Sequence, residues 1–261
     1  MIRAVASMCV VAAIAACNPG ADCACGLLDL GPGADSSTDS GSGADSAAGR
    51  DSGSGSDTDS GTETDSGPPP FSPAAMLAAL GDCVAIGGDY ATDVGEAANI
   101  EVCQTDGAVW WTSDMDIDCD GGREASCMVD PSYQAETSAS DPSGDPIDAN
   151  TVPFIVVPVP STRFRAADHG IALGQYGLVI YEGRYAFATF ADSGPSSIIG
   201  EGSYALAEVL GIPSSPISGG VDSGVTFILF AGAANRSRNI PDIAATDAAS
   251  SVLAHNFLSS H

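Results

Sequence analysis

Alternation of apolar and polar residues marks a set of short strands in the part of the chain that follows residue 70. Such alternation is the pattern of a strand with one buried face. Clusters of glycine, proline, serine and aspartate separate the runs and predict turns, with a tight hairpin at Glu182 and Gly183. The expected strands are residues 108–117, 154–159, 177–181, 185–190 and 225–230. The sequence therefore predicts a β-rich domain.

Two segments follow a helical pattern instead. Residues 203–210 form a short apolar run that ends at Gly211 and Pro213, which typically stop a helix. Residues 242–258 are rich in alanine and predict a C-terminal helix that covers the sheet. We therefore expect a mainly β fold, a small six-stranded barrel with one or two covering helices. Its strand, loop and helix order is similar to the double-psi barrel of several polysaccharide-cleaving enzymes.

The first 16 residues predict an export signal rather than a folded element. Arg3 is followed by an apolar run that is too short to span a bilayer. The run ends at Cys17 in a sequence that resembles a bacterial lipoprotein processing site, so Cys17 is the expected lipidation site. Ordinary secretory cleavage, with Cys17 paired to Cys23 or Cys25, is the alternative. Because Asn18 follows, we expect an outer-membrane or cell-surface location, with secretion as the alternative.

Residues 17–70 predict a tether between this signal and a domain at residues 71–261. From about residue 31 the tether consists mainly of Asp, Ser, Gly and Thr, with few apolar side chains. Such a segment has nothing to bury, so it cannot offset the conformational entropy of folding. The remaining length is enough for one domain with its own core.

The chain carries a formal net charge of -26, and eight of its acidic residues lie between residues 34 and 67. All eight of its basic residues other than histidine are arginines. A nucleic acid needs lysine and arginine for its phosphates, so we expect no nucleic-acid partner. Contact with a membrane is expected only through the lipid anchor.

Four cysteines fall inside the predicted domain, and an export signal would place them in an oxidising compartment. Proximity in sequence favours the pairs Cys83–Cys103 and Cys119–Cys127, although four cysteines permit three pairings. The spacings lack the close cysteine pairs of a structural zinc site. We therefore expect disulfides, no metal and no cofactor.

Two carboxylates stand at a strand, loop and helix unit that could carry acid–base chemistry. The expected strand 185–190 leads to Asp192 in a Ser/Gly/Pro loop, and Glu201 opens the helical pattern nine residues later. A glycosidase needs one carboxylic acid and one carboxylate base. Ile198 and Ile199 predict partial desolvation of Glu201, which suits an acid, and the wetter loop suits Asp192 as a base; the reverse assignment stays open. The structural alternative is a turn residue and a helix-end charge.

Alternating aspartates run from Asp114 to Asp120 and precede Gly121. They resemble the start of a calcium loop, but the twelfth position counted from Asp116 is Cys127 rather than the required glutamate. A row of aspartates on one strand face is the better prediction.

Several ordered segments together resemble the chitosanases of glycoside hydrolase family 75. The resemblance covers roughly residues 100–255, with two small departures at Ala191, where the family usually has Gly, and Gly202, where it has Ala. The matching segments are WWTSDMDIDCDG at 110–121, DPSYQ at 130–134, VPFIVVP at 152–158, the Asp192 and Glu201 segments, and DSGVTF at 222–227.

This resemblance implies endo-hydrolysis of chitosan with inversion, with Asp192 and Glu201 as the essential pair. Chitosan is cationic, so an acidic groove would attract it. We expect Asp118 and Asp120 to bind glucosamine ammonium groups, and Trp110 or Trp111 to stack on sugar rings, although strand alternation sends one of the two into the core. Further substrate contacts are expected from Gln134, Tyr204 and Asp222, and the protein is expected to be a monomer.

Two alternatives remain open at this point. One is a hydrolase or lytic enzyme that acts on another amino-sugar polymer, such as peptidoglycan. The other is a surface lipoprotein that binds polysaccharide without catalysis, against which the presence of both carboxylates argues.

Overall fold

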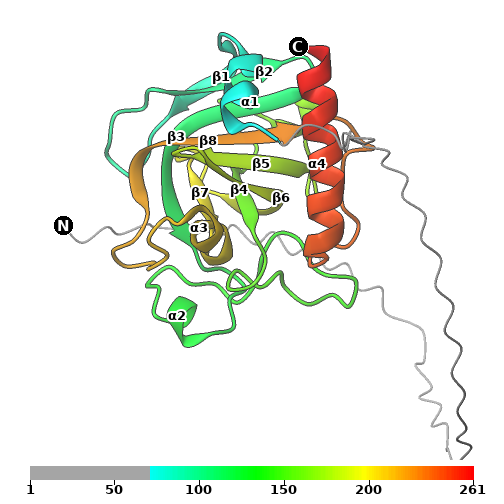
Figure 1. Ribbon diagram of the computed structural model, residues 1–261. Coiled ribbons are helices and arrows are strands. Elements are labelled where there is room, and N and C mark those ends of the chain that lie inside the picture. Colours follow the sequence, from blue (N-terminus) through cyan, green and yellow to red (C-terminus); the bar gives the residue numbers. More distant parts are fainter. Residues whose placement is uncertain (1–70) are drawn as a thin grey trace, which may run out of the picture. The chain divides into compact units, whose positions relative to one another are not determined.

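The computed structural model describes residues 71–261, which form a mixed β-barrel with few helices (Figure 1). The expected signal at residues 1–16 and the expected tether at 17–70 lie outside the described residues. The strands are β1 Val84–Tyr90, β2 Ile100–Thr105, β3 Ala108–Asp118, β4 Phe154–Pro158, β5 Tyr176–Tyr181, β6 Arg184–Gly194, β7 Glu201–Ser203 and β8 Val221–Phe230. The helices are α1 Pro73–Leu80, α2 Ala125–Met128, α3 Tyr204–Leu210 and α4 Ile243–Ser260, with a 3-10 turn at Ala166–His169.

Six of the strands close into the barrel in the order β3-β7-β4-β6-β5-β8, and a second pairing between β8 and β3 completes the ring. The pairs β3–β7 and β4–β6 are parallel, and the other pairs are antiparallel. β2 and β1 extend the sheet beyond β3 as the two extra strands. The expected mainly β six-stranded barrel is confirmed.

Alternation along β3 divides its tryptophans between two cores. Trp111 is fully buried in the main cluster and stacks on Phe227 of β8, with ring centroids 5.3 Å apart. Trp110 points to the other face, where its indole nitrogen donates to Thr105 Oγ1 at 3.2 Å. Strand alternation therefore sends one of the pair inward, as expected.

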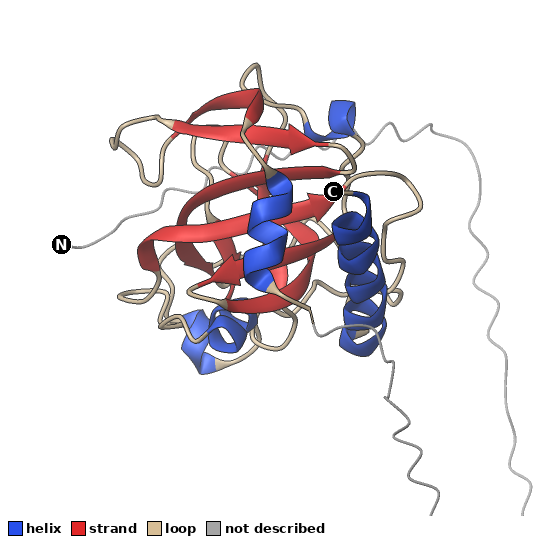
Figure 2. Cartoon of the chain, turned by 45° about the horizontal axis from the view of Figure 1, so that its top comes forward, coloured by secondary structure: helices blue, strands red, loops and turns tan. Residues whose placement is uncertain are grey.

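The outer face of the barrel is covered by α4, which packs on β5 and β6, and α1 packs against α4 (Figure 2). Both helices begin at a side chain that caps a free backbone N–H, Ser72 for α1 and Asp242 for α4. Buried Leu178, Ile228 and Phe257 form part of the apolar layer between helices and sheet. The expected C-terminal helix is confirmed. In the described residues, no helix is long and apolar enough to cross a membrane.

The strands predicted from alternation are all present, but two local expectations are wrong. Asp192 lies inside β6 rather than in a loop, because β6 continues to Gly194 along β4. Glu201 does not open the helix: it begins the short strand β7, and α3 starts only after Ser203, whose hydroxyl accepts from the Leu206 N–H. Both carboxylates are therefore held on strands.

Candidate active site

Four adjacent strands form the site, with Asp192 on one side of Val156 and Glu201 on the other. On the parallel strands β3 and β7, Asp116 pairs with Glu201. β4 separates β7 from β6, pairing with β7 at Gly202 and with β6 through Val156 and Asp192. Two strand spacings of about 4.8 Å place the Cα atoms of Asp192 and Glu201 roughly 10 Å apart.

A β-bulge in β6 sets the direction of Asp192. Ile155 and Val156 are consecutive on β4, but their partners on β6 are Phe190 and Asp192. Ala191 is therefore the extra residue, and it is fully buried. A bulge of this kind re-aims the next side chain. It brings Asp192 into line with Val156 and so places it across β4 from Glu201.

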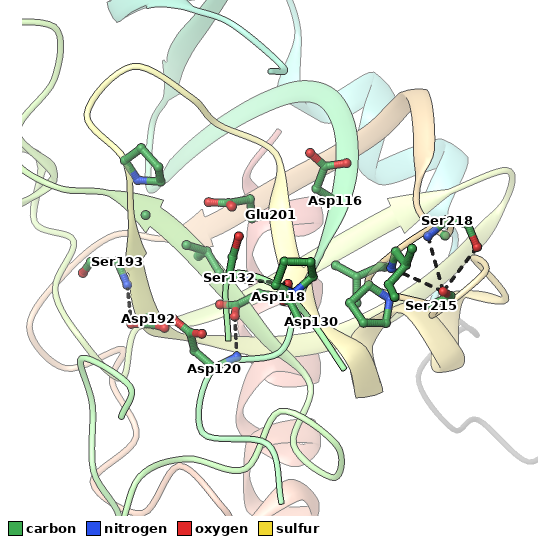
Figure 3. A pocket seen from close by; sticks show the side chains of 18 residues that line it. Asp116, Asp118, Asp120, Asp130, Ser132, Asp192, Ser193, Glu201, Ser215 and Ser218 are labelled. Atoms are coloured by element: carbon green, nitrogen blue, oxygen red, sulfur yellow. Dashed lines mark hydrogen bonds between the residues drawn. The ribbon is translucent and has the colours of Figure 1, made fainter. Parts of the chain in front are cut away.

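These side chains line one cavity of about 340 Å³ (Figure 3). Its wall is strongly acidic, and of the described residues that line it none is basic. Three prolines supply apolar surface. The lining carboxylates are Asp116, Asp118, Asp120, Asp130, Asp192 and Glu201, and the prolines are Pro131, Pro195 and Pro216.

Asp192 receives its hydrogen bonds from the backbone N–H and hydroxyl of Ser138, both at 2.8 Å, and from the Ser193 N–H at 2.7 Å. Its side chain is only 6% exposed. Burial raises the pKa of Asp192, while the three donors act against that rise because they stabilise the charged form. The site therefore holds Asp192 in a buried position where burial favours the protonated form and three hydrogen bonds reduce that preference.

Glu201 lies in the opposite environment. Its charged neighbours are carboxylates, namely Asp116, Asp192, Asp120 and Asp130. Burial, followed by the charge of Asp116 and then that of Asp192, raises the pKa of Glu201 to about 8. Ser203 anchors this short strand, because its hydroxyl donates to the Val152 carbonyl at 2.8 Å and accepts from the Phe154 N–H at 2.9 Å. Glu201 is therefore a fixed carboxylic acid near neutral pH.

Asp118, at the end of β3, and Asp120, in the following turn, lie beside Asp192. One carboxylate oxygen from each of the three lies within 4.8 Å of the others. Burial raises the pKa of Asp118 well above its usual range, and the charge of Asp192 adds to the effect. Burial also raises the pKa of Asp120 to about 7, although hydrogen bonds from Gln134 oppose this. Of the described residues, these three are the ones that could hold a cation, whether a metal ion or a substrate ammonium group.

The family model described as fungal chitosanase of glycosyl hydrolase group 75 matches residues 115–255. The chain belongs to glycoside hydrolase family 75. A search of curated proteins finds no significant match. The match begins inside β3 and ends inside α4, so it contains every carboxylate that lines the cavity. Family 75 membership indicates a glycosidase and implies chitosan as the substrate.

The two departures from the family 75 pattern fall on packed positions rather than on the cavity wall. Ala191 is the bulge residue, and it lies in a buried cluster with Val156. A Cβ on Gly202 would approach Leu206 Cδ2 to 2.7 Å and Met115 Cε to 2.8 Å, so these two side chains fill the space that an alanine methyl would need. Both differences are absorbed by neighbouring apolar side chains.

The other residues predicted to contact the substrate of this family 75 protein do not line the main cavity. Gln134 does not line the cavity; its backbone N–H and side-chain amide donate to Asp120 at 2.7 and 3.1 Å. Tyr204 packs at the start of α3 against the cluster that contains Val156. Asp222 lines a second, neighbouring cavity. Neither tryptophan lines the main cavity, so the structure does not support sugar stacking there.

Sequence reasoning missed several residues of this site. Asp116 belonged to the predicted row, but only its pairing with Glu201 gives it a place in the site. Asp130 and Ser132 reach the cavity from the loop after α2, and residues 215–219 form the facing wall. Ser138 lies in a loop without periodicity, and no sequence signal would have connected it with Asp192.

Proposed function

We propose that this family 75 protein is an endo-acting chitosanase that hydrolyses β-1,4 glucosaminyl linkages with inversion. One observation carries the proposal: Asp192 and Glu201 flank β4 at the same cavity, where hydrogen bonds stabilise the charged form of Asp192 and neighbouring acids disfavour that of Glu201. Inverting glycosidases use two carboxyl groups about 6.5–9.5 Å apart, which leaves room for a water molecule. A Cα separation of two strand spacings is compatible with that range.

The environments support a division of roles. Glu201 keeps its proton near neutral pH and is placed to protonate the leaving glycosidic oxygen as the general acid. Asp192 carries hydrogen bonds that favour its charged form, and it activates the attacking water as the general base. The product is the inverted anomer.

Endo action is supported by a second cavity beside the first. It is about 780 Å³ and shares residues 217–219 with the catalytic cavity. Glu182, Asp222 and Tyr181 lie on its wall. Two neighbouring cavities suit a chain that extends beyond the cleavage point, and their carboxylates suit the ammonium groups of glucosamine.

Viscometry and product analysis test this function. The purified protein should lower the viscosity of a chitosan solution quickly while reducing ends form slowly, because internal cuts shorten the chains first. Release of only monomer or dimer from the outset would contradict endo action. The first product seen by NMR should be the inverted anomer, and retention would mean that one carboxylate acts as a nucleophile.

Chitin and de-acetylated peptidoglycan serve as the comparison substrates. A higher rate on peptidoglycan would assign the protein to another amino-sugar polymer. Binding to chitosan without cleavage would assign it to surface polysaccharide binding.

We also propose that the protein is exported and anchored through lipid on Cys17, which lies outside the described residues. An acylated cysteine carries two or three chains, enough for a stable anchor. Cys17→Ser should move the protein from the detergent phase to the aqueous phase in detergent partitioning. A variant that still partitions with lipid would exclude Cys17 as the anchor.

A further inference from the structure

Asp192 holds all of its hydrogen bonds on one carboxylate oxygen. The Ser138 N–H and hydroxyl reach Oδ1 at 2.8 Å each, and the Ser193 N–H reaches the same atom at 2.7 Å. Within residues 71–261, no hydrogen bond reaches Oδ2. With three donors directed at Oδ1, this atom serves only as an acceptor, and Oδ2 is the oxygen left for a water molecule in the cavity.

The direction of the Ser138 hydroxyl proton follows from its other partner. The Ser193 N–H donates to Ser138 Oγ at 3.1 Å as well as to Asp192, so the serine oxygen accepts from one side. Its own proton is then directed at Asp192 Oδ1. The hydroxyl therefore links the loop to β6 by hydrogen bonds to both Asp192 and Ser193.

Ser138 is held in place by bonds that do not use its side chain. The next residue, Ala139, donates its N–H to the carbonyl of the bulge residue Ala191 at 2.9 Å. The preceding residue, Thr137, donates its hydroxyl to the Ala139 carbonyl at 2.7 Å and accepts from the Ile147 N–H at 2.8 Å. Removing the Ser138 hydroxyl would therefore leave the loop docked on β6.

We propose that Ser138 is a positioning residue of the catalytic base: its hydroxyl fixes Oδ1 of Asp192 and so aims Oδ2 at the attacking water. The inference rests on the proposed function and adds to it a residue from outside the catalytic strands. Ser138 acts through Asp192 and is not itself a catalytic residue.

The charges around Asp192 explain why a neutral donor matters here. Asp118 and Asp120 face it from the end of β3 and the following turn, and Glu201 interacts with it from β7. All three are carboxyl groups, and no basic residue of the described chain lines the cavity. Hydrogen bonds from Ser138 and Ser193 are therefore what acts against the burial that raises the pKa of Asp192.

Three single variants of the full chain test this role. Ser138→Ala should lower kcat about tenfold and leave KM nearly unchanged, since a hydrogen bond to a charged group is lost. The acid limb of its pH–rate profile should move up by about one pH unit, because the carboxylate has lost a donor. Ser138→Thr keeps the hydroxyl and should restore both values. Ser140→Ala, an exposed serine on the same loop, should behave as wild type.

A second measurement does not depend on catalysis. Carboxyl ¹³C NMR of aspartate-labelled protein, with the Asp192 signal assigned from Asp192→Asn, should show a higher titration midpoint in Ser138→Ala than in wild type. An unchanged titration midpoint in Ser138→Ala would overturn the inference. So would a Ser138→Ala protein that has a lower melting temperature but the same acid limb of the pH–rate profile as wild type. A wild-type protein that does not cleave chitosan would overturn the proposed function alone, because the titration would still report on Ser138.

Discussion

The carboxyl group of Glu201 lies against Gly194 of β6, a residue that has no side chain. A Cβ at Gly194 of β6 would collide with Oε2 of Glu201 and come within 3.0 Å of Val156 Cγ1. Gly194 has no left-handed backbone angle that would require glycine. Its lack of a side chain therefore serves the carboxyl group of Glu201, not the conformation of the strand.

Gly194→Ala should lower kcat by about one to two orders of magnitude, because a misplaced general acid loses much of its contribution. The melting temperature should change little, since the colliding atom is the far end of a flexible side chain. Gly88→Ala in β1 is the matched control, because its Cβ would meet neighbours no closer than 3.6 Å. Equal activity losses in the two variants would contradict a specific effect on Glu201.

Asp192→Asn and Glu201→Gln should each lower turnover by at least about 10²-fold, the low end of acid–base contributions. Both changes keep size and hydrogen-bonding capacity but remove the titrating group. Specific activity and melting temperature, measured together, check the outcome. Retained activity with a small loss of stability would mean that these residues have only local structural roles.

At the scale of elements, one disulfide anchors a wall of the cavity and the other does not. Cys119–Cys127 joins the end of the aspartate row to α2, and the loop after α2 carries Asp130 and Ser132. Cys83–Cys103 joins the start of β1 to β2 in the extension outside the barrel. The two pairs expected from proximity are both confirmed.

Replacing both cysteines of Cys119–Cys127 by serine should lower kcat/KM as well as stability. Closing an eight-residue separation contributes about 2–3 kcal/mol by the chain-entropy estimate. The same change at Cys83–Cys103 should lower the melting temperature and leave kcat/KM near the wild-type value. Loss of activity in both double variants at a temperature where both are folded would contradict the separation of roles.

Elements were predictable where a strand has a run of buried residues, as in β5 and β6. β1 was missed because its sequence VAIGGDY contains two glycines and only Tyr90 is buried, and β7 because three residues are too few for any period. The candidate carboxylates could be found by residue type and resemblance. Their arrangement could not, because periodicity does not tell which strands are neighbours, and the pairing of Asp116 with Glu201 depends on β3 and β7 being parallel.

At the scale of the whole molecule, the buried acids couple stability to pH. Burial raises the pKa of Asp118, of Asp120 to about 7, and of Glu201 to about 8. The unfolded chain releases these protons near pH 4, whereas the folded domain keeps them. The stability that they contribute is therefore fully present below about pH 4 and is lost as the pH rises through the folded values near 7 and 8.

The melting temperature of the wild type should fall as the pH rises from 5 to 8. The melting temperature of Glu201→Gln should fall less, because its amide has no proton to release. Thermal unfolding of both proteins across this range measures the difference. The wild type should be the less stable of the two at pH 8. Parallel curves for the two proteins would show that Glu201 does not titrate with a raised pKa.

The pairing of Asp116 on β3 with Glu201 on β7 also determines when the protein can become active. Asp116 meets Glu201 across a parallel pair, and β8, which follows both in sequence, must still close the ring against β3. Contacts between such distant segments form slowly, because a long loop must be closed before they are gained. No partly synthesised chain that ends before β7 contains both carboxylates. Hydrolysis should therefore begin only when the last barrel strand has joined, so the recovery of activity after denaturation reports completed assembly of the whole domain.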